Sequence, residues 1–123
     1  MSFFNWFSKS SSTSSTPNAD DIVKKDVCYH IEGFLACSYF HTATEAADRL
    51  AAKYPNVKID VSAYPRQQWP ERSLELQKEF DTTHRTSPFI YEGCSAGNQK
   101  VVGGYTDFAK LIKTNYQMIV PMD

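Results

Sequence analysis

The sequence predicts an α/β fold in which a mixed four-stranded sheet is flanked by helices. Short runs rich in β-branched and aromatic residues alternate with longer stretches that repeat apolar residues every three or four positions, and the resulting order is β-α-β-α-β-β-α. A helix between the first two strands makes them parallel, with a right-handed crossover. A turn between the last two strands makes them an antiparallel hairpin. The sheet is therefore expected to be mixed, with helices on both faces.

The first three elements follow from local residue patterns. Residues 27–31 (VCYHI) are β-branched and aromatic and end before Gly33, which favours a strand. Residues 41–54 place alanine, leucine and tyrosine at helical spacing, which favours a helix with one apolar face. Residues 56–61 (NVKIDV) alternate apolar and polar side chains, as a half-buried strand does.

The second half of the domain is expected to hold two helices and a hairpin. Residues 62–70 contain Pro65 and Pro70 and are interpreted as a loop, with Pro70 next to the first turn of a helix. The expected elements are a helix at residues 71–81, strands at 88–91 and 99–102, and a last helix at 106–116. Thr106 and Asp107 are candidates for the cap of that last helix.

Composition and charge exclude several classes of protein. The 123 residues fit one domain, and a net charge of -1 gives no broad basic surface, so no nucleic-acid partner is expected. The three cysteines, Cys28, Cys37 and Cys94, form no CxxC pair and have no metal-ligand spacing with the histidines. We therefore expect no disulfide framework and no metal site, and a reducing intracellular compartment, with the cytoplasm as the first choice.

The first twenty residues differ in composition from the rest. Because they are rich in serine and threonine, residues 1–20 are expected to form a disordered tail before a domain at 21–118, with a C-terminal tail at 119–123. An aromatic cluster lies at the start of the chain and consists of Phe3, Phe4, Trp6 and Phe7. Three interpretations of this cluster stay open: a free tail, a weak contact with a membrane surface or a partner, or part of an organelle-targeting segment.

Cys37 lies between the first predicted strand and the first predicted helix, in the stretch CSYF. Backbone N–H groups at a helix N-terminus carry partial positive charge, so a thiolate placed there is stabilised. His41, about one helical turn further on, is a candidate for additional support of the thiolate. A reactive nucleophile and a buried, inert cysteine are both compatible with this stretch alone.

Two further stretches suggest a ligand site. In HRTSPFI, residues 84–90, a cis Ser87–Pro88 bond would turn the preceding backbone toward an incoming peptide. In VVGGYTDF, residues 101–108, two glycines let a ligand approach the backbone, and the helix that follows offers N–H groups and a carboxylate to its charged ends. An ordinary trans proline and a standard glycine turn are the alternatives.

Taken together, the three stretches resemble the motifs of the glutaredoxin family: Cys-x-Tyr before the first helix, Arg-Thr-Ser-Pro before the third strand and Gly-Gly-x-x-Asp before the last helix. The resemblance spans roughly residues 25–116 and implies a thioredoxin-like fold. It also implies that the chain uses glutathione to reduce disulfides or protein–glutathione mixed disulfides. Some members of the family instead hold a [2Fe–2S] cluster between two subunits, with glutathione supplying two of the four thiolates.

The resemblance implies roles for individual residues. Cys37 matches the nucleophile, whereas support of its thiolate by His41 is a separate hypothesis, made because the family's usual lysine is missing. Ser87 is expected to pair its backbone with the glutathione cysteine. Arg85 belongs to the matched Arg-Thr-Ser-Pro stretch, and we hypothesise that it replaces the missing lysine as the contact for the glycine carboxylate of glutathione. The residues expected to bind glutathione are Tyr39, Arg85, Thr86, Ser87, Pro88, Gly104, Thr106 and Asp107.

The active-site stretch departs from the family pattern at three points. Phe40 stands where many members have a second cysteine, and Ser38 replaces the usual proline. The lysine expected a few residues before the nucleophile is absent from residues 33–36, and Glu32 lies nearby. The chain is therefore expected to work with one thiol.

The other two cysteines are not expected to act as partners of Cys37. Six residues of strand separate Pro88 from Cys94, a distance of about 20 Å, and Cys28 lies inside the first strand. Disulfide geometry requires Cα atoms within about 7 Å. Cys28 is therefore interpreted as a core residue, Cys94 as a loop residue, and His30 as a core histidine with satisfied hydrogen bonds.

The resulting hypothesis is a glutathione-dependent oxidoreductase that reduces protein–glutathione mixed disulfides with a single thiol. Its partners would be glutathione and glutathionylated proteins, and it would act as a monomer. The first alternative is a carrier or sensor of a [2Fe–2S] cluster, favoured by Ser38, in which Cys37 and glutathione bind the cluster in a dimer. The second alternative is a glutathione-binding module of low activity, suggested by the absent lysine.

Overall fold

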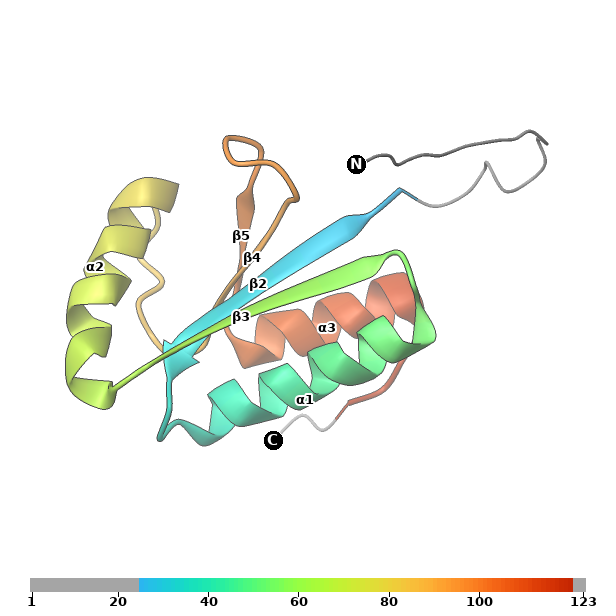
Figure 1. The fold of residues 1–123 in the computed structure, drawn as a ribbon, viewed down its shortest axis with the longest axis horizontal. Coiled ribbons are helices and arrows are strands. Elements are labelled where there is room, and N and C mark those ends of the chain that lie inside the picture. The colour runs from blue at the N-terminus through green and yellow to red at the C-terminus, as the bar shows by residue number, and fades with distance from the viewer. Residues whose placement is uncertain (1–24, 121–123) are drawn as a thin grey trace, which may run out of the picture.

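The computed structural model describes residues 25–120, which form one four-stranded sheet and its covering helices (Figure 1). The elements, in chain order, are β2 (Val27–Phe34), α1 (Ser38–Lys53), β3 (Val57–Tyr64), the short 3-10 helix η3 (Arg66–Gln68), α2 (Trp69–Phe80), β4 (Phe89–Glu92), β5 (Lys100–Gly103) and α3 (Tyr105–Tyr116). The element order predicted from the sequence is confirmed, with η3 as an addition.

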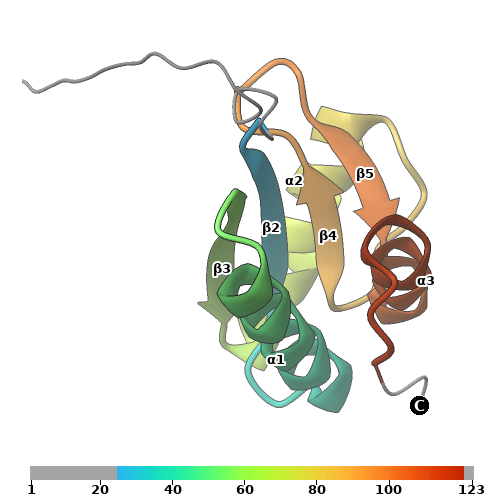
Figure 2. The ribbon, with the colours of Figure 1, turned by 90° about the vertical axis from the view of Figure 1, so that its right-hand side faces the viewer.

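The strands lie in the order β3-β2-β4-β5. Strand β2 pairs with β3 in parallel and with β4 in antiparallel fashion, and β4 and β5 form an antiparallel hairpin. Figure 2 shows α1 and α3 on one face of this sheet and α2 on the other. The predicted mixed sheet with helices on both faces is therefore confirmed.

Several element boundaries differ from the prediction. Strand β2 continues through Gly33 to Phe34 because its parallel register with β3 holds to the pair Phe34–Tyr64. For the same reason β3 extends to Tyr64, so the predicted loop at 62–70 is wrong at both ends: α2 already begins at Trp69. Helix α1 begins at Ser38, three residues before the predicted start.

The main core lies between the sheet and helices α1 and α3. Its buried apolar side chains include Tyr29, Ile31, Phe40, Leu50, Ile90, Phe108 and Ile112. Met118 and Val120 pack in the same core, so the packed chain reaches beyond the predicted domain end at residue 118. A smaller core of Trp69, Leu76 and Phe89 lies on the α2 face of the sheet.

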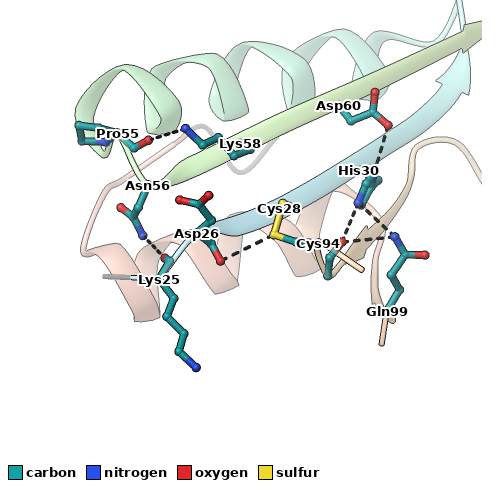
Figure 3. Close-up of a disulfide and its surroundings, with 11 residues drawn as sticks. Lys25, Asp26, Cys28, His30, Pro55, Asn56, Lys58, Asp60, Cys94 and Gln99 are labelled. Atoms are coloured by element: carbon teal, nitrogen blue, oxygen red, sulfur yellow. Dashed lines mark hydrogen bonds and ion pairs between the residues drawn. A yellow bond between two sulfur atoms is a disulfide. The ribbon is translucent and has the colours of Figure 1, made fainter. Parts of the chain in front are cut away.

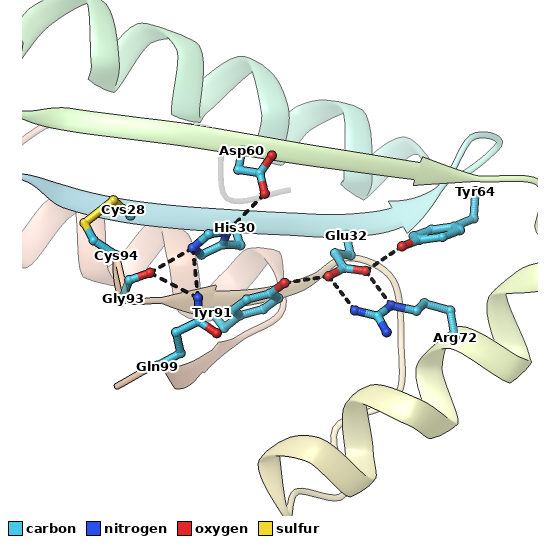
Figure 4. Close-up of polar contacts among 10 residues, drawn as sticks. All are labelled: Cys28, His30, Glu32, Asp60, Tyr64, Arg72, Tyr91, Gly93, Cys94 and Gln99. Carbon is cyan, nitrogen blue, oxygen red and sulfur yellow. Dashed lines mark hydrogen bonds and ion pairs between the residues drawn. A yellow bond between two sulfur atoms is a disulfide. The ribbon is translucent and has the colours of Figure 1, made fainter. Parts of the chain in front are cut away.

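Glu32 is a buried carboxylate on the α2 face, with 4% of its surface exposed (Figure 4). It accepts hydrogen bonds from Nε and Nη2 of Arg72 at 2.7 and 3.0 Å, and from the hydroxyls of Tyr64 at 2.9 Å and Tyr91 at 2.6 Å. Burial by itself raises the pKa of Glu32, but the hydrogen bonds from Arg72, Tyr91 and Tyr64 outweigh it and lower the pKa below its ordinary value. These hydrogen bonds hold α2 against the end of β2.

Cys28 and Cys94 form a disulfide across a sequence separation of 66 residues (Figure 3). The interpretation of Cys28 and Cys94 as an unbonded core residue and loop residue is therefore wrong, whereas the expectation that neither pairs with Cys37 is confirmed. The antiparallel ladder between β2 and β4 continues past the pair Tyr29–Glu92, and the backbone N–H of Gly93 donates to the carbonyl of Cys28 at 2.9 Å. This pairing leaves the Cα atoms of Cys28 and Cys94 4.9 Å apart, within bonding reach.

His30 has partners on both ring nitrogens, as expected for a satisfied core histidine (Figure 4). Its Nδ1 lies 3.1 Å from the carboxylate of Asp60, and its Nε2 lies 2.8 Å from the carbonyl oxygen of Gly93. Its ring stacks on Tyr91 with centroids 4.7 Å apart. His30 thus joins β3 and the loop after β4 to the central strand.

The predicted tail at residues 1–20 and its aromatic cluster lie outside the described residues. Within residues 25–120, no helix combines the length and apolar character that a membrane crossing requires.

Candidate active site

Cys37 is the N-cap residue of α1. Its backbone N–H donates to the carbonyl of Phe34 at 3.0 Å, and its carbonyl accepts the N–H of His41 at 3.3 Å, the first hydrogen bond of the helix. The N–H groups of the first turn therefore point toward the Cys37 end, and that turn contains no acidic residue. The partial positive charge of the helix N-terminus thus acts on the sulfur without an opposing carboxylate in that turn.

The Cys37 thiol is free and only partly buried. Its Sγ donates to the carbonyl oxygen of Ser87 at 3.5 Å, and the Ser87–Pro88 peptide bond is cis. The hydroxyl of Ser87 accepts the backbone N–H of Phe34 at 3.2 Å, which holds the segment before β4 against the end of β2. Gly33 makes room for this contact, because a Cβ there would overlap the Phe40 ring and the Ser87 hydroxyl.

A groove of about 440 Å³ opens beside this contact, between the first turn of α1, the segment before β4 and the start of α3. It is lined by Tyr39, His84, Thr86, Ser87, Pro88, Gly104, Tyr105, Thr106 and Asp107. All residues expected to bind glutathione line it, except Arg85. Its volume suits a ligand of tripeptide size.

The start of α3 shapes one wall of the groove. Gly103 has a φ of 127°, and a Cβ there would overlap the carboxylate of Asp107. Gly104, not Thr106 or Asp107 as predicted, is the N-cap residue, and its N–H donates to Oδ2 of Asp107 at 3.1 Å. Thr106 and Asp107 lie in the first turn and are exposed at the groove.

Two side chains that line the groove were missed in the sequence. His84 lies with its Nε2 3.2 Å from the carbonyl oxygen of Pro88, and the ring centroid of Tyr105 lies 6.1 Å from that of Tyr39. His84 belongs to the stretch HRTSPFI and Tyr105 to VVGGYTDF, the two stretches that suggested a ligand site. Their position next to the expected ligand-binding residues could have predicted that they line the groove. Both add aromatic surface to the lining of the groove.

Two predicted side chains are not brought to the groove. Nε2 of His41 lies 2.6 Å from the carbonyl oxygen of Leu35, which directs its ring to the turn before the helix. Arg85 lines a different groove, next to α2, and its carbonyl accepts hydrogen bonds from the indole of Trp69 at 3.3 Å and the hydroxyl of Ser73 at 2.7 Å. Support of the thiolate by His41 and a carboxylate contact by Arg85 stay predictions.

The fold and this groove define the class: the chain has a thioredoxin-like fold with a partly exposed thiol at the start of a helix. It is similar to a structure of reduced glutaredoxin from Escherichia coli, with 24% identity, a TM-score of 0.57 and coverage of 74% of this chain and 99% of that chain. A second structure of E. coli glutaredoxin gives 24% identity, a TM-score of 0.54 and the same 74% and 99% coverage. No family model and no curated protein matches the chain. At this level of identity the comparison shows the fold.

Proposed function

We propose that the protein is a glutathione-dependent thiol–disulfide oxidoreductase that reduces protein–glutathione mixed disulfides with Cys37 as its single thiol. The observation behind this proposal is that the Ser87 carbonyl contacts the Cys37 sulfur while Ser87 also lines the 440 Å³ groove. A glutathione bound in that groove would present its sulfur next to Cys37.

In the first step, the Cys37 thiolate attacks the glutathione sulfur of the mixed disulfide. A bond forms between Cys37 and glutathione, and the bond between glutathione and the protein breaks. The protein sulfur leaves as a thiolate and takes a proton from solvent. The protein substrate is thereby reduced, and Cys37 is oxidised to its mixed disulfide with glutathione.

In the second step, the thiolate of a second glutathione attacks the sulfur of the glutathione held on Cys37. Oxidised glutathione leaves, and Cys37 returns as a thiolate. Over the two steps, two glutathione molecules supply the two electrons. The helix N-terminus at Cys37 stabilises the leaving thiolate in this step and the attacking thiolate in the first.

The groove offers complementary groups to the ends of glutathione. The N-terminus of α3 suits the α-carboxylate of the γ-glutamyl residue, and the Asp107 carboxylate suits its ammonium group. The backbone of Ser87 is expected to pair with the glutathione cysteine as an added strand would.

The disulfide between Cys28 and Cys94 supports the single-thiol route. Both cysteines are bonded to each other, so Cys37 is the free cysteine among residues 25–120. The reduction of a glutathione mixed disulfide needs only one nucleophile.

The alternative of a [2Fe–2S] cluster needs four thiolates. Within residues 25–120, no three His, Cys, Asp or Glu side chains gather as a metal site. Cys37 fits one ligand position because it is free and partly exposed, and a second chain and two glutathione thiolates would complete the set. When bound, such a cluster would supply one-electron transfer or be handed on as cargo.

The test is an assay with a glutathionylated peptide and glutathione, in which oxidised glutathione is measured through NADPH and glutathione reductase. We expect turnover in the wild-type protein and none above background in Cys37→Ser. Equal rates in the two proteins would reject the proposed function.

A further inference from the structure

A second groove, of about 490 Å³, lies on the other side of the segment Arg85–Ser87. It is lined by Phe34, Trp69, Pro70, Ser73, Gln77, Arg85, Thr86 and Ser87. Most of its surface is apolar, and Phe34, Trp69 and Pro70 are among the lining residues. None of the lining residues is acidic.

The two grooves share a wall. Thr86 and Ser87 line both of them, and the wall is fastened to α2 through the two hydrogen bonds that the Arg85 carbonyl accepts from Trp69 and Ser73. The Ser87 carbonyl on this wall contacts Sγ of Cys37. The second groove therefore starts next to the reacting sulfur, although it is separate from the expected glutathione site.

Positive charge borders the second groove. The guanidinium of Arg66 lies 5.5 Å from the centroid of the Phe34 ring, and Arg85 is a lining residue. Among residues 25–120, neither arginine forms an ion pair, whereas Arg72 is paired with Glu32 and Glu75. An occupant that combines an apolar side chain with a carboxylate is complementary to this surface.

We infer that the second groove binds the protein part of the mixed disulfide substrate: a segment with a large apolar side chain and an acidic residue close to the glutathionylated cysteine. The inference rests on the proposed function. The disulfide that Cys37 attacks joins glutathione directly to the protein cysteine. With glutathione in the first groove, the cysteine sulfur of the protein substrate is bonded directly to the glutathione sulfur. The substrate chain therefore lies next to the shared wall.

The experiment compares three glutathione mixed disulfides with the full chain. Two are short peptides that differ only beside the cysteine, one with Phe and Glu and one with Ala and Lys. The third is the mixed disulfide with 2-mercaptoethanol, which is too small to reach the second groove. At low salt we expect kcat/KM to be about tenfold higher for the Phe/Glu peptide than for the Ala/Lys peptide.

Two variants test the surface. Phe34→Ala removes an apolar side chain and should reduce the ratio of kcat/KM values for the two peptides from about tenfold to about twofold. Arg66→Glu should reduce the same ratio by a factor of about three at low salt, and by less at high salt. Leu74→Ala on the exposed side of α2 and Arg49→Glu on α1 are matched controls and should keep the full preference. Activity on the small substrate should be unchanged in Arg66→Glu and in the two control variants. Arg66 is exposed, so Arg66→Glu keeps the test valid if Phe34→Ala does not fold.

The outcomes separate the inference from the proposed function. Absence of activity on the small substrate rejects the proposed function itself. Activity on the small substrate without peptide preference, or a preference that Phe34→Ala and Arg66→Glu leave intact, overturns the inference alone. If the preference emerges only after Phe3, Phe4, Trp6 and Phe7 are replaced by serine in the full chain, the chain's own aromatic cluster occupies the groove, which also overturns it.

Discussion

The sulfur of Cys37 lies 3.5 Å from the carbonyl oxygen of Ser87, although the two residues are 50 positions apart in the sequence. This contact joins the N-terminus of α1 to the segment that separates the two grooves. Because Ser87 is also held by the backbone N–H of Phe34, the sulfur has a defined position beside the first groove. Reactivity and ligand binding should therefore be coupled at this point.

The first prediction concerns this coupling. Iodoacetamide should modify one of the three cysteines of the native, unreduced protein, and peptide mass spectrometry should identify it as Cys37. S-methylglutathione should slow the modification about tenfold when its concentration is about ten times its Kd, because it covers the sulfur. An equal rate with and without S-methylglutathione would contradict a glutathione site beside Cys37.

The second prediction concerns the disulfide. Because Cys28–Cys94 closes a loop of 66 residues, its loss should lower the free energy of unfolding by about 2–4 kcal/mol. Urea denaturation of the wild-type protein with and without dithiothreitol measures this effect. The double variant Cys28→Ser/Cys94→Ser should show the lower stability and no response to dithiothreitol, while keeping the reactive Cys37.

The third prediction concerns the buried carboxylate. Glu32→Gln should lower the free energy of unfolding by about 2–3 kcal/mol because it leaves the Arg72 guanidinium without its buried partner. Glu75→Gln, which removes the exposed partner of the same arginine, should change it by less than about 1 kcal/mol. Similar losses in both variants would contradict a special role for the buried pair.

The same carboxylate gives a fourth prediction, on pH. The pKa of Glu32 is lower in the folded protein than its ordinary value of 4.5, so the unfolded chain takes up the proton first as the pH falls. The contribution of ionised Glu32 to the free energy of unfolding is therefore complete above about pH 4.5, and it is lost as the pH falls through the pKa of Glu32 in the folded protein. Urea denaturation between pH 6 and pH 3 should show a smaller loss of stability in Glu32→Gln than in the wild type.

The fifth prediction concerns Gly103, the glycine before the start of α3 beside the first groove. Gly97 and Gly103 both have a positive φ, so alanine strains the backbone at either position. Only at Gly103 would the added Cβ overlap Asp107, whereas at Gly97 it meets nothing within 4 Å. Gly103→Ala should therefore cost at least about 1 kcal/mol more stability than Gly97→Ala, and it alone should raise the KM for glutathione.

The sequence by itself was sufficient for the order of elements, the mixed sheet and the three stretches around the first groove. These features are local: apolar spacing distinguishes strands from helices, and glycine and proline mark the turns between them. Residues from CSYF, RTSP and GGYTD meet at one end of the sheet. CSYF follows β2, RTSP precedes the antiparallel strand β4, and GGYTD begins at the last residue of β5, so the strand directions bring all three to the same end.

Tertiary structure alone decided the relationships between side chains of separate elements. Strand register brought Cys28 next to Cys94, and the packing of α2 placed Arg72 on Glu32 and turned Arg85 away from the first groove. Local periodicity shows which face of an element is apolar, but it contains no information on the register between strands or on the position of one element against another. Those depend on contacts between residues far apart in the chain, which form only when the whole core packs.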